Sequence, residues 1–248
     1  MRHALLAILA IILLDNRQPA AAQDVDQLLQ QASEASQRRE PERSILFLNE
    51  AIKQEPNLSV AYYLRGRANF CAAHFADSVA DFDKHVQLEP RAANRQWERG
   101  IACYYAHQFA KGARQFEDYQ KYHDQDVENS VWRYLCVARD GGVDKARSTL
   151  LPITNDGRVP MMQIYSLYQG KIKPDEVLTA ASHDAPNREL ANQRLFYAHL
   201  YVGLWHEAAG NAEEAKKHIL EAEKLKIAHY MWDVAHVHAQ QFRLADKQ

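Results

Sequence analysis

The sequence predicts an all-α fold, an α-solenoid of paired helices, and three observations lead to that prediction. Gly66 recurs 34 residues later as Gly100, and Phe82 recurs at the same interval as Phe116. Within each such stretch, apolar and small residues recur at three and four positions, the period of a helix buried along one side. With 248 residues and 47% hydrophobic content, the chain is large enough to bury a core.

The first 22 residues, 1–22, have the pattern of a secretory signal peptide. A short basic start is followed by an unbroken apolar run over 4–14 and by Pro-Ala-Ala-Ala at 19–22. That apolar run is shorter than the ~20 residues that cross a bilayer. We therefore expect cleavage after residue 22, no stable membrane anchor after cleavage, and a periplasmic or secreted protein.

Residues 23–126 are expected to form N-terminal repeat units at 25–58, 59–92 and 93–126. Pro56 and Pro90, again 34 apart, are expected to end the second helix of successive units. Gly66 and Gly100 fall inside predicted helices, where glycine costs ~1 kcal/mol relative to alanine. The same cost at the same position of two units indicates that a neighbouring helix passes too close for a side chain.

The rest of the chain is expected to be helical as well. Residues 127–195 are predicted to form degenerate helical repeats, with a turn at Gly141-Gly142 and a helix that starts at Pro174. Residues 196–248 are predicted to form a C-terminal unit, with Gly203 in its first helix, and then a capping helix over about 230–244. Such a cap covers the end of a stack of repeats.

These features resemble the tetratricopeptide repeat family, whose 34-residue unit is a helix-turn-helix with a small residue in its first helix and a closing proline. The chain departs from the family pattern at several positions. These are Arg65 and Arg99 in place of leucine, Ser78 and Gly112 in place of alanine, and Asp124 in place of the third unit's proline. We expect Arg65 and Arg99 to be structural, with Asp81 or Asp83 as partner for Arg65 and Glu117 for Arg99.

The resemblance implies a binding module, because the first helices of successive units in this family line a groove that binds extended or helical peptides. Carried onto this sequence, the peptide-binding positions are Tyr63, Arg67, Phe70, Trp97, Ile101, Tyr104 and Tyr105. Aromatic and arginine side chains dominate binding hot spots, because they bury much area. The alternative, that some of these seven pack between helices, stays open.

We therefore predict an exported, non-enzymatic scaffold or adaptor that binds protein or peptide partners. The sequence has no G-x-S-x-G, no phosphate-binding glycine loop and no H-E-x-x-H. The formal charge of -2 argues against nucleic-acid binding, which normally needs a basic stripe. No cofactor is expected, and self-association through the end faces stays open.

The histidines of the C-terminal helices support an alternative function, metal binding or catalysis. His199 and His206 are seven residues apart on one helix face, His229 and His236 repeat that spacing, and His218 lies between. Three of them together have the donors that zinc or nickel prefers. Histidine on a packed helix face is the commoner case, so no metal ligand is assigned.

Three cysteines, Cys71, Cys103 and Cys136, are expected on helices among apolar neighbours. An odd number cannot all pair within one chain, and the spacing matches no zinc ribbon. We expect them to be buried as small hydrophobic residues. If a disulfide forms, Cys71 with Cys103 is the candidate pair.

Overall fold

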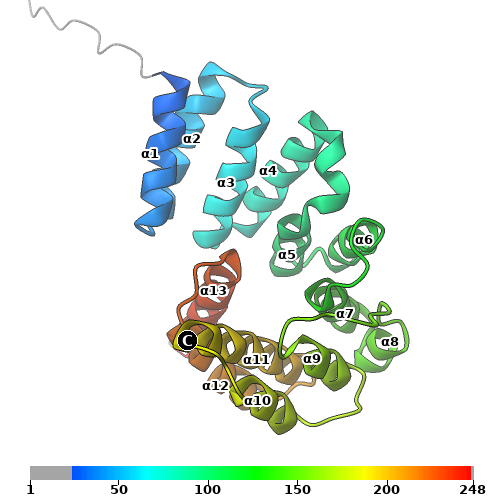
Figure 1. The fold of residues 1–248 in the computed structure, drawn as a ribbon. Helices are drawn as coiled ribbons and strands as arrows, with labels where there is room; N and C mark the ends of the chain where they lie inside the picture. The colour runs from blue at the N-terminus through cyan, green and yellow to red at the C-terminus, as the bar shows by residue number, and fades with distance from the viewer. Residues whose placement is uncertain (1–23, 247–248) are drawn as a thin grey trace, which may run out of the picture.

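The computed structural model describes residues 24–246, and within these residues the chain is helical throughout, without β-strands (Figure 1). The all-α solenoid is therefore confirmed. The predicted signal peptide lies outside the described residues. The helices are α1 (Val25–Gln37), α2 (Pro41–Gln54), α3 (Ser59–Cys71), α4 (Phe75–Leu88), the 3-10 helix η1 (Pro90–Arg95), α5 (Trp97–Tyr105), α6 (Phe109–Gln120), α7 (Val127–Gly141), α8 (Val143–Ser148), α9 (Met161–Tyr168), α10 (Pro174–Ser182), α11 (Arg188–Ala208), α12 (Ala212–Lys224) and α13 (Tyr230–Ala245).

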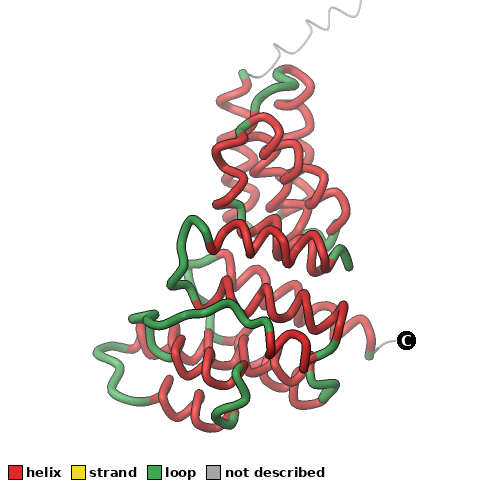
Figure 2. The backbone as a smooth tube through the Cα atoms, turned by 90° about the vertical axis from the view of Figure 1, so that its right-hand side faces the viewer, coloured by secondary structure: helices red, strands yellow, loops and turns green. Residues whose placement is uncertain are grey.

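Consecutive helices pack as pairs, and each pair stacks on the next along a curved path. Figure 1 shows the path as an arc that runs from α1 and α2 round to α11 and α12, and Figure 2 shows the stack from the side. The last helix, α13, packs on α12 and also reaches α3 on the inner side of the arc. Among the described helices, none is both long enough and apolar enough to span a bilayer.

The tight turns between the paired helices repeat at the predicted interval. Arg39, Ala73 and His107, each 34 residues after the last, all have a positive φ, at 61°, 60° and 58°. Side chains other than glycine rarely take this left-handed conformation. The same turn therefore closes the first three helix pairs, as the 34-residue register predicts.

The glycines that recur in the first helices lie where a neighbouring helix approaches too closely for a side chain, as predicted. A Cβ placed on Gly66 would lie 3.1 Å from the Phe82 ring, and one on Gly100 would lie 2.5 Å from the Phe116 ring. In the C-terminal pair, a Cβ on Gly203 would meet the Ile219 side chain at 2.9 Å. In each pair, a large side chain of the second helix occupies the space that the glycine leaves.

An arginine row, Arg65, Arg99 and Arg133, joins successive helix pairs. Each guanidinium reaches a partner 16 residues before it and another 16 residues after it, on the second helix of two adjacent pairs or, for Thr149, at the C-cap of that helix. The partners are Asn49 and Asp81 for Arg65, Asp83 and Gln115 for Arg99, and Glu117 and Thr149 for Arg133.

The predicted Arg65–Asp81 ion pair is confirmed, with a shortest N···O distance of 2.6 Å. The expected Arg99–Glu117 pair is wrong. Arg99 instead binds Asp83 of the preceding pair at 2.7 Å, and Glu117 accepts from Arg133 at 3.0 Å. The physical reason is that an arginine on a first helix lies between two second helices and reaches both.

The middle of the chain is irregular but continues the stack. Helix α7 begins at Val127, the predicted start of the degenerate segment, and ends at Gly141, with Gly142 as its C-cap at a φ of 86°. Pro174 is the first residue of α10, as expected. The proposed boundary between residues 195 and 196 falls inside α11, a 21-residue helix that begins at Arg188.

The three cysteines are free thiols. Cys103 and Cys136 are fully buried, and burial raises the pKa of the Cys103 thiol to about 11. Cys71 is half-buried on α3. Thus Cys103 and Cys136 behave as the small hydrophobic residues that the sequence predicts, and Cys71 lies at the site described next.

Candidate functional site

The inner face of the arc carries the seven predicted groove residues, and the structure buries most of them. Phe70 and Ile101 are fully buried, and Tyr104 and Tyr105 are less than a tenth exposed. Tyr63, Arg67 and Trp97 are half-buried; they are the predicted residues with the most remaining exposure.

The helix that covers this face is α13 of the same chain. The Tyr230 ring packs on the rings of Phe70 and Trp97, in both cases with centroids 5.7 Å apart. Farther along α13, His238 Nδ1 lies 2.8 Å from the Tyr105 hydroxyl. Thus α13 caps the last pair by packing on α12, as expected, and its opposite side fills the groove, which was not expected.

The sequence of α13 contains a signal for this double packing. Its buried residues include Tyr230, Met231, Trp232, Val234 and Val237, which point to several sides of the helix. A helix that is apolar all round is buried all round, whereas a cap exposes a polar outer face. The pattern thus indicates a helix enclosed on both sides, although it does not identify the second surface.

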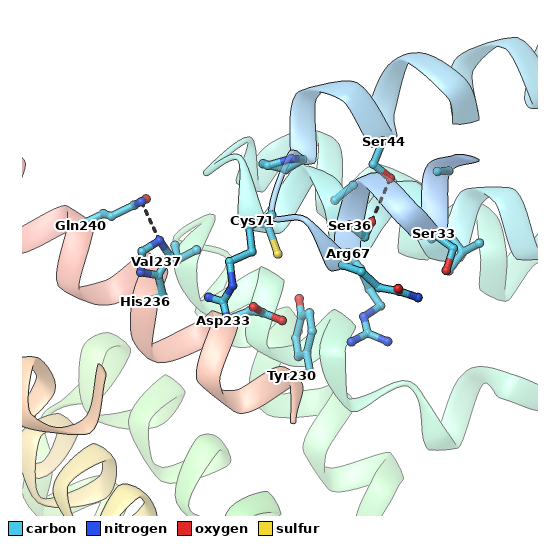
Figure 3. A pocket seen from close by; sticks show the side chains of 16 residues that line it. Ser33, Ser36, Ser44, Arg67, Cys71, Tyr230, Asp233, His236, Val237 and Gln240 are labelled. Carbon is cyan, nitrogen blue, oxygen red and sulfur yellow. Dashed lines mark hydrogen bonds between the residues drawn. The ribbon is translucent and has the colours of Figure 1, made fainter. Parts of the chain in front are cut away.

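Between α13 and the first three helices, a cavity of about 380 Å³ stays open, and we call it the α13 cavity. Its polar lining includes Ser33, Ser36, Arg39, Arg67, Tyr230 and Asp233. Figure 3 shows the Tyr230 hydroxyl directed into this space, with Arg67 on one side and Asp233 on the other. Of the seven predicted residues, only Arg67 lines the cavity.

The polar groups of the cavity are held by packing contacts more than by ion pairs. The Arg67 guanidinium lies 4.4 Å from the centre of the Tyr230 ring, and the Arg39 guanidinium lies 3.6 Å from that of Trp232. Both are cation–π contacts. One Arg67 N–H group also donates to the Tyr63 hydroxyl, at 3.5 Å. Burial raises the pKa of Asp233, although the nearby Arg39 and Arg67 oppose the rise.

One lining atom lacks a partner altogether. The Tyr230 hydroxyl is buried and has no hydrogen-bond partner among the described residues. A buried polar atom of this kind costs free energy and is normally satisfied by protein, water or ligand. The α13 cavity therefore has two cationic groups and one carboxyl group in its lining, and the unpaired Tyr230 hydroxyl lies in its wall.

Cys71 lies in the wall of the cavity, where its chemistry is that of a neutral thiol. Burial raises the pKa of Cys71 to about 12, and the nearby Asp233 carboxyl acts in the same direction. Because the thiolate is the reactive form, this cysteine is a poor nucleophile at neutral pH. Cys71 thus contributes surface to the cavity rather than covalent chemistry.

The structure brings three of the histidines of the C-terminal helices together and places two others elsewhere. His199, His206 and His218 come together on α11 and α12. His229 instead stacks on Trp97, and His236 binds Glu223 with 2.7 Å between Nδ1 and Oε1.

Comparison with known proteins finds one partial sequence match and solved structures of similar fold. No protein-family model matches it. The SGT1 homologue of Bos taurus is 25% identical over 124 residues, which are 50% of this chain and 36% of that protein. The chain thus matches only about a third of the length of this curated relative.

Among solved structures, MamA (41-end) of Desulfovibrio magneticus RS-1 covers 83% of this chain and 97% of its own, with 16% identity and a TM-score of 0.50. YrrB, described as a TPR protein with an unusual peptide-binding site, covers 89% of this chain and 100% of its own, with 16% identity and a TM-score of 0.43. At this level of identity, the likeness to MamA concerns the fold.

Proposed function

We propose that this chain, an α-solenoid of tetratricopeptide repeats, is an exported, non-enzymatic scaffold that holds a protein partner by a peptide segment in the α13 cavity. The observation that carries the proposal is the buried hydroxyl of Tyr230, unpartnered among the described residues, in the wall of an open cavity. A volume of about 380 Å³ lies in the range of ligand pockets and suits a few side chains of an extended segment. Export is supported by the signal-peptide pattern of residues 1–22.

The charges around the cavity favour a partner segment with a carboxylate. Arg39 and Arg67 supply two guanidinium groups against the single carboxyl group of Asp233. Arginine binds carboxylates through paired N–H donors, and such charge-assisted hydrogen bonds are stronger than neutral ones. The Tyr230 hydroxyl would donate to a backbone carbonyl of the same segment.

The predicted groove residues then have two roles. Arg67 contacts the ligand, whereas Phe70, Trp97 and Tyr105 hold α13 in place through their contacts with Tyr230 and His238. The proposed ligand site is therefore the space that α13 forms with α1 and α3, and not the groove that the sequence predicts. Aromatic contacts that fix a wall of the cavity reduce the entropy lost when a ligand binds.

The test compares peptide binding by the wild type with binding by a variant that lacks only the Tyr230 hydroxyl. The mature chain, from residue 23, selects ligands from a library of short acidic peptides, and the Kd of the selected peptide is measured by calorimetry. Tyr230→Phe keeps the ring and removes the hydroxyl, so affinity should fall about three- to tenfold, the value of about one hydrogen bond. Arg67→Gln should weaken binding further.

Arg43→Gln is the matched control, because Arg43 is exposed on α2, pairs with Glu40 and does not line the cavity. Circular dichroism should show that all three variants keep the helical fold. Equal affinity in wild type, Tyr230→Phe and Arg67→Gln would remove the cavity from the proposal.

A further inference from the structure

The hairpin of α11 and α12 gathers three metal-binding side chains at the end near its turn. His206 lies in the last turn of α11, and Glu214 and His218 lie one helical turn apart on α12. One ligand atom from each of these residues lies within 4.8 Å of the other two. The His206 and His218 rings are nearly parallel, at 8°, with centroids 5.7 Å apart.

A fourth residue fixes the orientation of the cluster. His199 Nδ1 lies 3.0 Å from His218 Nδ1, and one of these two nitrogens must donate to the other. If His218 donates from Nδ1, its Nε2 keeps a free lone pair. This Nε2 lies 3.8 Å from Glu214 Oε2, on the side of the proposed ligands. Metal-binding histidines commonly have such a partner on the other ring nitrogen, which selects the tautomer.

We propose that His206, Glu214 and His218 bind a Zn²⁺ ion, with His199 as the residue that positions His218. Two imidazoles and a carboxylate are donors that zinc prefers, and three protein ligands leave one position of a tetrahedral ion for water or a partner's donor. Zn–N and Zn–O bonds of about 2.0–2.2 Å bring the ligand atoms to roughly 3.3 Å from one another. The observed ligand atoms lie within 4.8 Å of one another, so the half-exposed His206 and Glu214 side chains must rotate to reach that spacing.

The present contacts of the two half-exposed ligands are easily exchanged. Glu214 pairs with Lys217 at 2.9 Å, an ion pair at the surface that solvent screens. The Asn211 amide lies 3.5 Å from His206 Nδ1, the upper limit for a hydrogen bond. Neither contact closes the space between the three ligands.

The ion would tie α11 to α12 just after the turn that joins them. Helix α12 in turn supports α13, because the Trp232 indole N–H donates to the Glu223 carbonyl oxygen at 3.0 Å. The zinc site thus stabilises the C-terminal part of the stack. It does not rest on peptide binding in the α13 cavity, and either proposal can fail without the other.

Glu214 had a signal in the sequence that was missed. It stands four residues before His218, so both side chains lie on one helix face. The histidines alone suggest a site of His199, His206 and His218. The structure instead makes His199 the partner of His218 and brings the carboxylate of Glu214 into the cluster.

The experiment titrates ZnCl₂ into the chelator-treated mature chain by calorimetry. One ion per chain should bind, and His206→Gln and Glu214→Gln should each weaken binding about tenfold or more. Both residues are half-exposed, so these variants should remain folded. His199→Phe should weaken binding about 10–100-fold, as is typical when the partner of a metal ligand is lost. X-ray absorption at the zinc edge should show two imidazoles.

His183→Gln is the matched control, because His183 is an exposed histidine beside Asp184 and far from the cluster in the sequence. Zinc should raise the Tm of wild type and of this control, but not that of the His206→Gln/Glu214→Gln double variant. If all three proteins bind zinc with the same affinity, the ion attaches to surface histidines at large and the proposal is wrong. Absence of zinc binding to wild type would also overturn it.

Discussion

The Tyr230 ring of α13 packs against the Phe70 ring of α3, with 5.7 Å between their centroids. This contact joins the last described helix to the second helix pair, across the inner side of the arc (Figure 1). The arc is therefore closed by its own C-terminal helix. The same contact sets the width of the α13 cavity, because Tyr230 lines it.

Tyr230→Ala should lower the free energy of unfolding by about 3–5 kcal/mol, the usual cost of removing a large buried aromatic ring. Tyr230→Phe should leave stability unchanged or raise it, because the lost hydroxyl is buried without a partner among the described residues. Urea unfolding followed by circular dichroism measures both variants. A loss of less than about 1 kcal/mol for Tyr230→Ala would mean that α13 is not held by this ring.

Gly100→Ala should destabilise the chain, because the added Cβ would lie 2.5 Å from the fully buried Phe116 ring. Overpacking of this kind costs about 1–3 kcal/mol, more than the ~1 kcal/mol gained from the better helix propensity of alanine. Gly66→Ala should cost less, since its contact with Phe82 is longer, at 3.1 Å. The Tm from thermal unfolding should be lower for Gly100→Ala than for Gly66→Ala.

Gly157→Ala is the control for the glycine series, because no atom lies within 4 Å of the Cβ it adds. It should leave the Tm within a few degrees of wild type. If Gly100→Ala were as stable as Gly157→Ala, the close approach of α5 and α6 would not explain the glycine.

The N-terminal units could be predicted from sequence because their contacts are local. Gly100 meets Phe116 only 16 residues later, so the spacing alone records which residues touch. The arginine row shows where the spacing no longer predicts the repeat unit. Arg133 continues the step of Arg65 and Arg99, yet Tyr134 follows it where the earlier units have glycine, so the 34-residue pattern weakens in the fourth pair.

The site could not be predicted to the same degree, because it depends on how the whole stack curves. Arg67 and Phe70 of α3 contact Tyr230 of α13, but nothing local in the sequence shows that α13 returns to α3. Small rotations between successive pairs add up along the chain and decide where the last helix lies. The α13 cavity forms only because these rotations bring α13 close to α1 and α3.

Arg99→Ala should destabilise the junction between the second and third helix pairs. Arg99 donates to Asp83 of the preceding pair and to Gln115 of its own, each at 2.7 Å. Hydrogen bonds that involve a charged group contribute about 1.5–3 kcal/mol, and we expect a loss of about 2 kcal/mol. Arg99→Lys should recover only part of it, because an ammonium group lacks the planar fork that reaches both acceptors.

Arg43→Ala, which removes an exposed pair with Glu40, is the control for the arginine row and should change stability by less than about 1 kcal/mol. Chemical denaturation compares the three variants. Equal effects of Arg99→Ala and Arg43→Ala would show that the row does not join the pairs.

Glu128 should contribute stability that is lost as the pH rises from about 4.5 to about 7. Burial, and then repulsion from Asp126, raise the pKa of Glu128 from its ordinary 4.5 to about 7, against the opposing effects of Arg158 and the Tyr201 hydroxyl. The folded chain therefore holds this proton more tightly than the unfolded chain. Between the two pKa values, the unfolded state loses the proton first, so a rising pH favours unfolding.

Glu128→Gln should remove this falling contribution from the stability curve, because an amide does not titrate. For one carboxyl group, the slope that disappears is at most about 1.4 kcal/mol per pH unit. Urea unfolding at several pH values between 4 and 8 measures the difference between the wild type and the variant. Glu213→Gln, on the exposed side of α12, should keep the wild-type slope. Parallel curves for the wild type and Glu128→Gln would show that Glu128 is ionised throughout, held by Arg158, whose Nη1 lies 2.7 Å from its carboxylate.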